Sequence, residues 1–250
     1  MMNLLPGLTA DTLAIVGMGL VIAGVIKGAT GLGYASCALP FLVYAVGLKT
    51  AIAFVLVPAM ATNVAVALGN GHFATTCRTF APLYLAMLPG IALGMWMLVQ
   101  VDTHTAVRVL GLSIVAYAVF SLSRPELILP PQLSQTLQVP VGLTNGFLTG
   151  LTGSQVMPMV PYFLALDLPP ARIVQAINLG VLMASAALAA GLATSGIADR
   201  SVLAASVIAI LPALIGVELG RRLQTRIPAA VLKKAILFVL ALAGLGLILR

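Results

Sequence analysis

The segment Gly28-Ala29-Thr30-Gly31-Leu32-Gly33 interrupts an apolar run, and Gly150-Leu151-Thr152-Gly153-Ser154-Gln155 interrupts another in the second part of the chain. An apolar stretch with a proline follows each of them, at Pro40 and at Pro161. A helix broken at membrane depth leaves backbone N–H and C=O groups that lipid cannot satisfy, so such breaks survive only where they line a buried cavity. Breaks at matching places in two halves indicate the substrate site of a membrane transporter.

The composition is that of a helical membrane protein. Hydrophobic residues make up 61% of the 250 residues and charged residues only 8%, with a mean hydropathy of +1.13. Soluble domains carry about 25% charged residues. At roughly 20 residues per crossing, the chain is long enough for about eight crossings or up to ten shorter segments. The apolar runs do not alternate with polar residues as barrel strands do. We therefore expect an all-α, polytopic membrane protein.

The apolar runs also predict two similar halves, 1–123 and 138–250, joined by a polar connection at 124–137. Leu88-Pro89-Gly90 in the first half corresponds to Leu211-Pro212-Ala213 in the second. Glycine and proline are frequent in all membrane helices, which is the alternative explanation for the likeness. The pattern leaves open whether the repeats are inverted or parallel. The ten expected segments are roughly 10–26, 31–47, 51–69, 79–99, 107–123, 138–149, 153–166, 173–195, 201–219 and 231–249.

The charge of the chain indicates membrane topology rather than nucleic-acid binding. The net charge is +7, and many of the basic residues lie within 200–234. Lysine and arginine concentrate in cytoplasmic loops, so we expect the loop at 220–234 to be cytoplasmic. Glu218 is expected to pair with a basic neighbour such as Arg221. The two cysteines, Cys37 and Cys77, do not suggest a disulfide framework.

Lys27, directly before the first break, is the most informative ionisable residue. An intramembrane lysine usually marks a substrate path, but a lysine at a helix end can also extend to the interface as an anchor. Half-helix N-termini favour anions, and glycines allow a ligand close to the backbone. Ser and Thr hydroxyls can bond back to their own helix, and buried asparagines, including Asn63, can simply join helices. The predicted anion-binding set is Lys27, Thr30, Gly31, Gly33, Asn145, Thr152, Gly153, Ser154, Gln155 and Asn178.

Enzymatic chemistry has weak support in the sequence. His72 and His104 fall in expected loops and form no metal-binding motif, and there is no P-loop for ATP. We therefore expect neither a cofactor nor a metal. The alternative is an intramembrane enzyme that uses Ser154 or a histidine.

The glycine-rich breaks, the proline in each following helix and the duplicated halves resemble the TauE/SafE family of sulfite and organosulfonate exporters. The resemblance covers about residues 10–249. It implies a multi-pass permease of the bacterial inner membrane that moves a small anion: sulfite, an organosulfonate or a small carboxylate. Alternating access around the two breaks is the expected mechanism. A facilitative anion channel is the alternative, and the sequence leaves open whether the protein forms a homo-oligomer.

Overall fold

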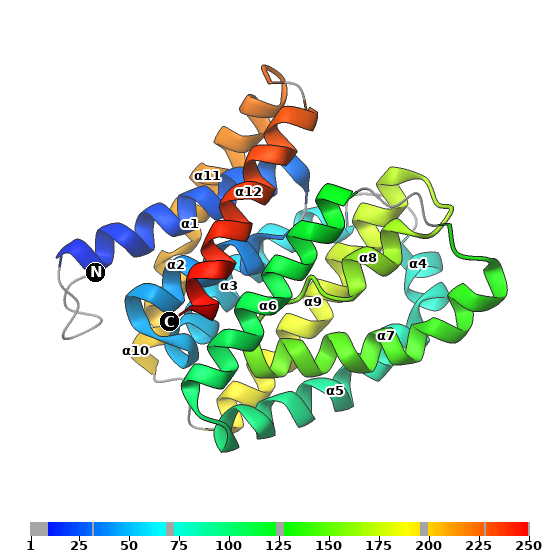
Figure 1. The fold of residues 1–250 in the computed structure, drawn as a ribbon, viewed down its shortest axis with the longest axis horizontal. Helices are drawn as coiled ribbons and strands as arrows, with labels where there is room; N and C mark the ends of the chain where they lie inside the picture. Colours follow the sequence, from blue (N-terminus) through cyan, green and yellow to red (C-terminus); the bar gives the residue numbers. More distant parts are fainter. Residues whose placement is uncertain are drawn as a thin grey trace.

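The computed structural model describes residues 10–31, 33–68, 73–123, 128–195, 200–227 and 229–249, and Figure 1 shows their arrangement. These residues form helices without any strand, which confirms the all-α prediction. The helices are α1 (Ala10–Thr30), α2 (Tyr34–Val46), α3 (Leu48–Leu68), α4 (Phe73–Thr79), α5 (Ala81–Gln100), α6 (Thr103–Ser123), α7 (Pro131–Thr152), α8 (Met159–Leu164), α9 (Pro170–Ser195), α10 (Arg200–Ile208), α11 (Ile210–Gln224) and α12 (Ala229–Ile248).

The long apolar helices are those of a polytopic membrane protein. Among the described residues, five stretches are long and apolar enough to cross a bilayer: Thr12–Thr30, Ala81–Gln100, Thr103–Ser123, Pro170–Thr194 and Ala204–Gln224. Shorter apolar helices cover Tyr34–Val46, Leu48–Val64 and Lys234–Ile248. Exposed leucines, valines and a tryptophan, such as Trp96 and Leu242, cover the outer surface of these helices, as expected where side chains face lipid.

Rows of glycines bring α1 against α11. A Cβ atom added at Gly28 would lie 2.0 Å from the carbonyl oxygen of Val217, and one added at Gly220 would lie 2.1 Å from that of Val25. The two backbones are therefore in direct contact, in the small-residue packing typical of membrane helices.

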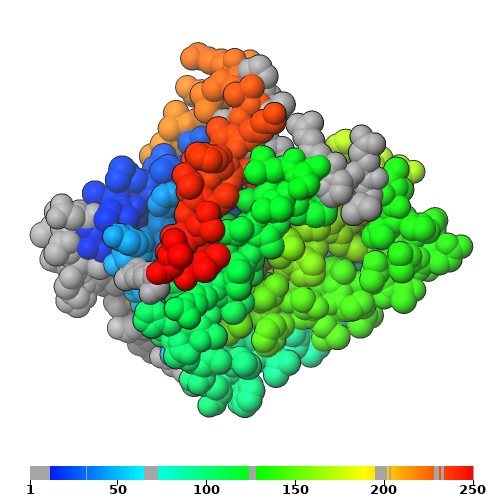
Figure 2. All heavy atoms as spheres, viewed as in Figure 1, coloured from blue at the N-terminus to red at the C-terminus, as the bar shows by residue number. Residues whose placement is uncertain are grey.

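The same kind of contact joins α5 to α7. A Cβ atom at Gly94 would lie 2.1 Å from the carbonyl oxygen of Phe147, and one at Gly146 would lie 2.2 Å from that of Met87. Thus α1 of the predicted first half packs on α11 of the second, and α7 of the second packs on α5 of the first. Of the remaining long helices, α3 packs on α9, and α6 lies beside α12 on the face shown in Figures 1 and 2.

Both glycine segments leave the helical conformation, but later than the sequence suggested. Helix α1 continues to Thr30, and α2 begins at Tyr34 after Gly33 at φ 80°. Helix α7 continues to Thr152, and Gly153 at φ 76° caps it. Left-handed glycines are common helix caps because glycine has no Cβ to clash at positive φ.

Four expected boundaries are therefore corrected. The helices predicted to end at 26 and 149 each run on to the residue before a left-handed glycine, Gly31 or Gly153. The segment predicted as helical over 153–166 is wrong for 153–158, because α8 begins only at Met159. The connection at 124–137 is helical from Pro131, since proline suits the first turn of a helix. Leu32 and residues 124–127 lie outside the described residues.

Candidate functional site

Lys27 is buried where α1, α3 and α9 meet. Its side chain is only 3% exposed, and Nζ donates hydrogen bonds to Oδ1 of Asn63, at 2.7 Å, and to Oδ1 of Asn178. A lysine that anchors a helix end at the interface would keep Nζ in water. In this structure the ammonium group points into the protein instead.

The two asparagines are held so that their oxygens face Lys27. Asn178 Nδ2 donates to the carbonyl oxygens of Val174, at 2.7 Å, and Gly31, at 3.1 Å. Asn63 Nδ2 donates to the carbonyl oxygen of Ala59 at 2.5 Å. Asn178 therefore connects Lys27 to the first glycine segment. The sequence predicts Asn178 as a site residue but does not distinguish Asn63, because an isolated asparagine in an apolar helix usually only joins helices.

No carboxylate whose side chain the structure describes pairs with Lys27. Asp102 and Asp167 are exposed. Glu218 accepts from Arg221 and Arg222, each at 2.8 Å, which confirms the predicted pairing of Glu218 with a basic neighbour. The side chain of Asp11 and the residues Glu126 and Asp199 lie outside the described part. A buried cation with neutral partners lacks a compensating charge, and an anionic ligand can supply one.

The second glycine segment lies against the first turn of α2. Ser154 Oγ is 3.1 Å from Ser36 Oγ, and the backbone N–H of Gln155 donates to Ser36 Oγ at 3.4 Å. Gln155 Nε2 donates to Ser185 Oγ at 3.0 Å. The two segments, far apart in the sequence, are thus joined through Ser36. Ser36 is not among the residues predicted from the sequence, since only its place in the first turn after Gly33 distinguishes it from other serines of membrane helices.

Three other predicted residues donate their side-chain hydrogen bonds to the backbone. Thr30 and Thr152 hydroxyls donate to the carbonyl oxygens of Ile26, at 2.8 Å, and Leu148, at 2.6 Å, as hydroxyls in membrane helices usually do. Asn145 Nδ2 donates to the carbonyl oxygens of Gln155 and Met157 at 3.2 and 2.9 Å. Asn145 therefore supports the non-helical stretch after Gly153.

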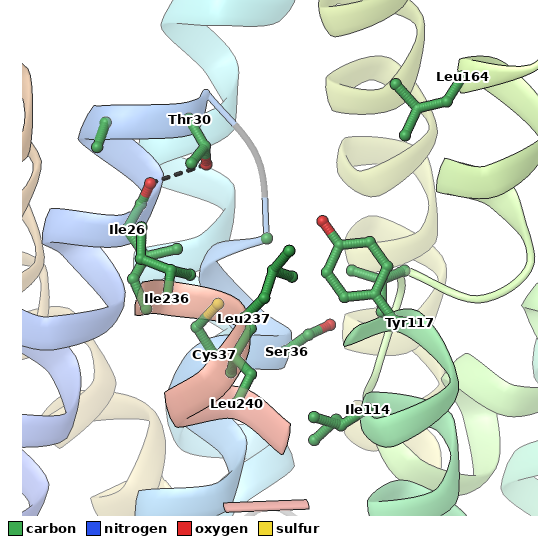
Figure 3. Close-up of a pocket in the computed structure, with 13 residues that line it drawn as sticks. Ile26, Thr30, Ser36, Cys37, Ile114, Tyr117, Leu164, Ile236, Leu237 and Leu240 are labelled. Carbon is green, nitrogen blue, oxygen red and sulfur yellow. Dashed lines mark hydrogen bonds between the residues drawn. The ribbon is translucent and has the colours of Figure 1, made fainter. Parts of the chain in front are cut away.

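Two cavities border the first glycine segment. The outer cavity, drawn in Figure 3, has a volume of about 230 Å³ and lies between α1, α2, α6 and α12. The inner cavity is about 10 Å³ and is lined by the start of α2, Asn63 and Gln155. Gly33, Ser36 and Val156 line both cavities. These three residues therefore separate the outer cavity from the inner cavity, which lies beside Asn63.

Among the described residues, those suggested for enzymatic chemistry are not brought together. Ser154 contacts Ser36 and Thr152. His104 is exposed in the first turn of α6, and His72 lies outside the described residues. Within the described part of the chain, histidine, cysteine, aspartate and glutamate form no group of three that could hold a metal. Cys37 and Cys77 are free thiols.

Comparison with known proteins identifies the family. Residues 15–247, nearly the whole chain, match the family model described as Sulfite exporter TauE/SafE. No curated protein and no solved structure matches the chain. The family is one of membrane exporters of sulfite, which agrees with the long apolar helices and does not suggest an enzyme. The resemblance seen in the sequence is therefore confirmed, and the chain belongs to the sulfite exporter TauE/SafE family.

Proposed function

We propose that this protein is a secondary transporter that moves a small anion across the bacterial inner membrane. The candidate anions are sulfite, an organosulfonate and a small carboxylate. Membership of a sulfite exporter family supports the class of activity.

The observation that carries the proposal is the environment of Lys27. Its ammonium group is buried and bonded to two amide oxygens, and no described carboxylate neutralises it. A buried charge is costly unless it is paired. An anion that enters beside Asn63 pairs with this charge only while it is bound, and this makes the site selective for anions without holding a permanent counter-ion.

We further propose alternating access around the two glycine segments. Support comes from the way helices of one predicted repeat pack on helices of the other. Helix α1 packs on α11 and α7 on α5, and α3 packs on α9 and α6 on α12. This is the pattern expected of two repeats related by a two-fold axis, with 1–123 and 138–250 as the repeats. Ser36, Ser154 and Gln155 lie where the two repeats would meet.

The test is thermal unfolding of the purified protein with a panel of small anions. A ligand that binds only the folded state raises the melting temperature. We expect sulfite or an organic anion to do so, and Lys27→Met to weaken this anion's binding roughly 10- to 100-fold, since hydrogen bonds to charged groups contribute about 1.5–3 kcal/mol. Lys49→Met is the matched control, because Lys49 is exposed at the start of α3.

Two results would contradict the proposal. One is that no anion shifts the melting temperature. The other is that Lys27→Met and Lys49→Met respond equally. Flux into proteoliposomes then separates a transporter from a channel: anion on the far side accelerates exchange through an alternating-access transporter, and it does not accelerate passage through an open pore.

A further inference from the structure

The two cavities beside the first glycine segment have different chemistry. The outer cavity is mainly apolar: Ile26, Ile114, Val156, Leu164, Leu237 and Leu240 contribute to its wall. Figure 3 shows Ile26, Leu237 and Leu240 on one side of the space and Ile114 and the ring of Tyr117 on the other, with the Ser36 side chain between them. A strongly hydrated inorganic anion gains nothing from such a wall and loses its water there.

The wall of the inner cavity is mixed: Ser36, Asn63 and Gln155 lie beside aliphatic side chains such as Val160 and Ile177, and the cavity adjoins the asparagine that Lys27 contacts. It lies at the N-terminus of α2, where Tyr34, Ala35 and Ser36 form the first turn, and the free N–H groups and positive helix end favour an anion. Asn63, which also lines it, accepts from Lys27. At about 10 Å³, the cavity has room for about one oxygen atom.

Two residues that line the inner cavity each carry a buried polar atom without a hydrogen-bond partner, and this indicates a ligand. Tyr34 and Gln155 both line the cavity and are 1% and 3% exposed; the Tyr34 hydroxyl and Gln155 Oε1 have no hydrogen-bond partner among the described residues. The Tyr34 hydroxyl can donate. Gln155 now donates through Nε2 to Ser185. The Ser185 hydroxyl can both donate and accept. Rotation of the Gln155 amide group by a half-turn would therefore let Oε1 accept from Ser185 and would place the Nε2–H donor where Oε1 now lies.

We infer that the transported anion is organic and amphipathic: an oxygen of its sulfonate or carboxylate head enters the inner cavity, and its short hydrocarbon body occupies the outer one. This inference rests on the proposed function and narrows its substrate class away from inorganic sulfite. The shared wall of Gly33, Ser36 and Val156 is where head and body join. The outer volume of 230 Å³ is smaller than the 300–1,000 Å³ typical of drug-sized ligands, so the body is short.

The test compares sulfite with linear alkylsulfonates from methanesulfonate to hexanesulfonate on the purified full chain. We expect the affinity to rise about fourfold for each added methylene, the equivalent of about 0.8 kcal/mol, until the outer cavity is full. Leu240→Trp should abolish the gain with chain length, because Leu240 lines the cavity and is 2% exposed. Leu242→Trp, on the same helix at 54% exposure, should preserve it.

A second variant protects the test against misfolding of Leu240→Trp. Leu240→Ala enlarges the cavity and should extend the gain in affinity to longer chains. The inference is overturned if affinity does not depend on chain length, or if Leu242→Trp abolishes the gain as Leu240→Trp does, which would place the chains on the lipid-facing surface. Binding of sulfite alone, lost in Lys27→Met, would overturn this inference and leave the proposed function standing. Failure of every anion to bind would remove both.

Discussion

At the scale of single residues, Lys27 is notable because the hydrogen-bond acceptors of its ammonium group are neutral. Asparagine oxygens are good acceptors, yet they carry no charge, so they hold Nζ in place without neutralising it. A carboxylate in the same place would form a strong, permanent charge-assisted pair. The neutral partners keep the ammonium group ready for an anion from solution.

This reasoning predicts the effect of Asn63→Asp. The substitution keeps the shape of the side chain and gives Lys27 an internal counter-ion, which competes with the transported anion. We expect anion affinity to fall at least about tenfold, measured as the concentration that half-saturates the melting-temperature shift.

The matched control adds the same charge elsewhere. Gln175→Glu, also buried, keeps the acceptor that Thr76 uses at 3.1 Å, on α9, the helix that also carries Asn178. We expect it to retain anion binding. Unchanged affinity in Asn63→Asp would show that the charge of Lys27 is not used by the ligand.

How much of the site the sequence predicts depends on the rarity of each residue in an apolar run. Lys27 and Asn178 stand out for that reason, but their contact cannot be predicted, since 151 residues separate them and only the tertiary fold brings the two side chains together. The sequence does not distinguish Ser36 as a site residue, because serine is common in membrane helices. The positions of Thr30 and Thr152 at the breaks predict a role in binding, yet their hydroxyls donate to carbonyl oxygens of their own helices.

At the scale of helices, glycine has two separate roles that the sequence alone does not distinguish. Gly31, Gly33 and Gly153 have positive φ and allow the chain to leave a helix. Gly28 and Gly150 are helical and sit in close crossings, although they belong to the same glycine-rich segments. This is why the sequence predicts both helix ends about one turn too early: in the sequence, the glycines that serve packing look the same as those that end the helix.

The crossing of α1 and α11 can be tested with a pair of alanine substitutions on one helix. Gly28→Ala places a Cβ 2.0 Å from the Val217 carbonyl oxygen, whereas nothing lies within 4 Å of the Cβ at Gly17. We expect Gly28→Ala to destabilise the protein by about 1–3 kcal/mol through overpacking. Gly17→Ala should be neutral or slightly stabilising, since alanine favours a helix over glycine.

The measurement is the melting temperature of each variant, at about 2–4 °C per kcal/mol for a chain of this size. Gly146→Ala, in the crossing of α7 with α5, should behave like Gly28→Ala because its Cβ would lie 2.2 Å from the Met87 carbonyl oxygen. Equal stability of Gly28→Ala and Gly17→Ala would mean that the helices do not meet at these glycines.

At the scale of the whole molecule, the two predicted repeats are connected because a helix of each packs closely on a helix of the other. Helix α1 is held by α11, and α7 by α5, so each repeat can move only together with a helix of its counterpart. The glycine segments lie between these pairs, where Ser36 meets Ser154 and Gln155. A motion of one pair against the other would therefore open or close the shared wall of the two cavities.

Alternating access of this kind predicts how Cys37 reacts with a small thiol reagent. Cys37 lines the outer cavity and is 2% exposed, so it reacts only when the cavity opens. In proteoliposomes that contain the Cys77→Ser variant, we expect a reagent added to either side of the membrane alone to label Cys37 slowly. A saturating transported anion should slow that labelling about tenfold, because the anion occupies the same space. Labelling from one side only, at a rate independent of the anion, would instead indicate a fixed pore in which the two pairs of helices do not move.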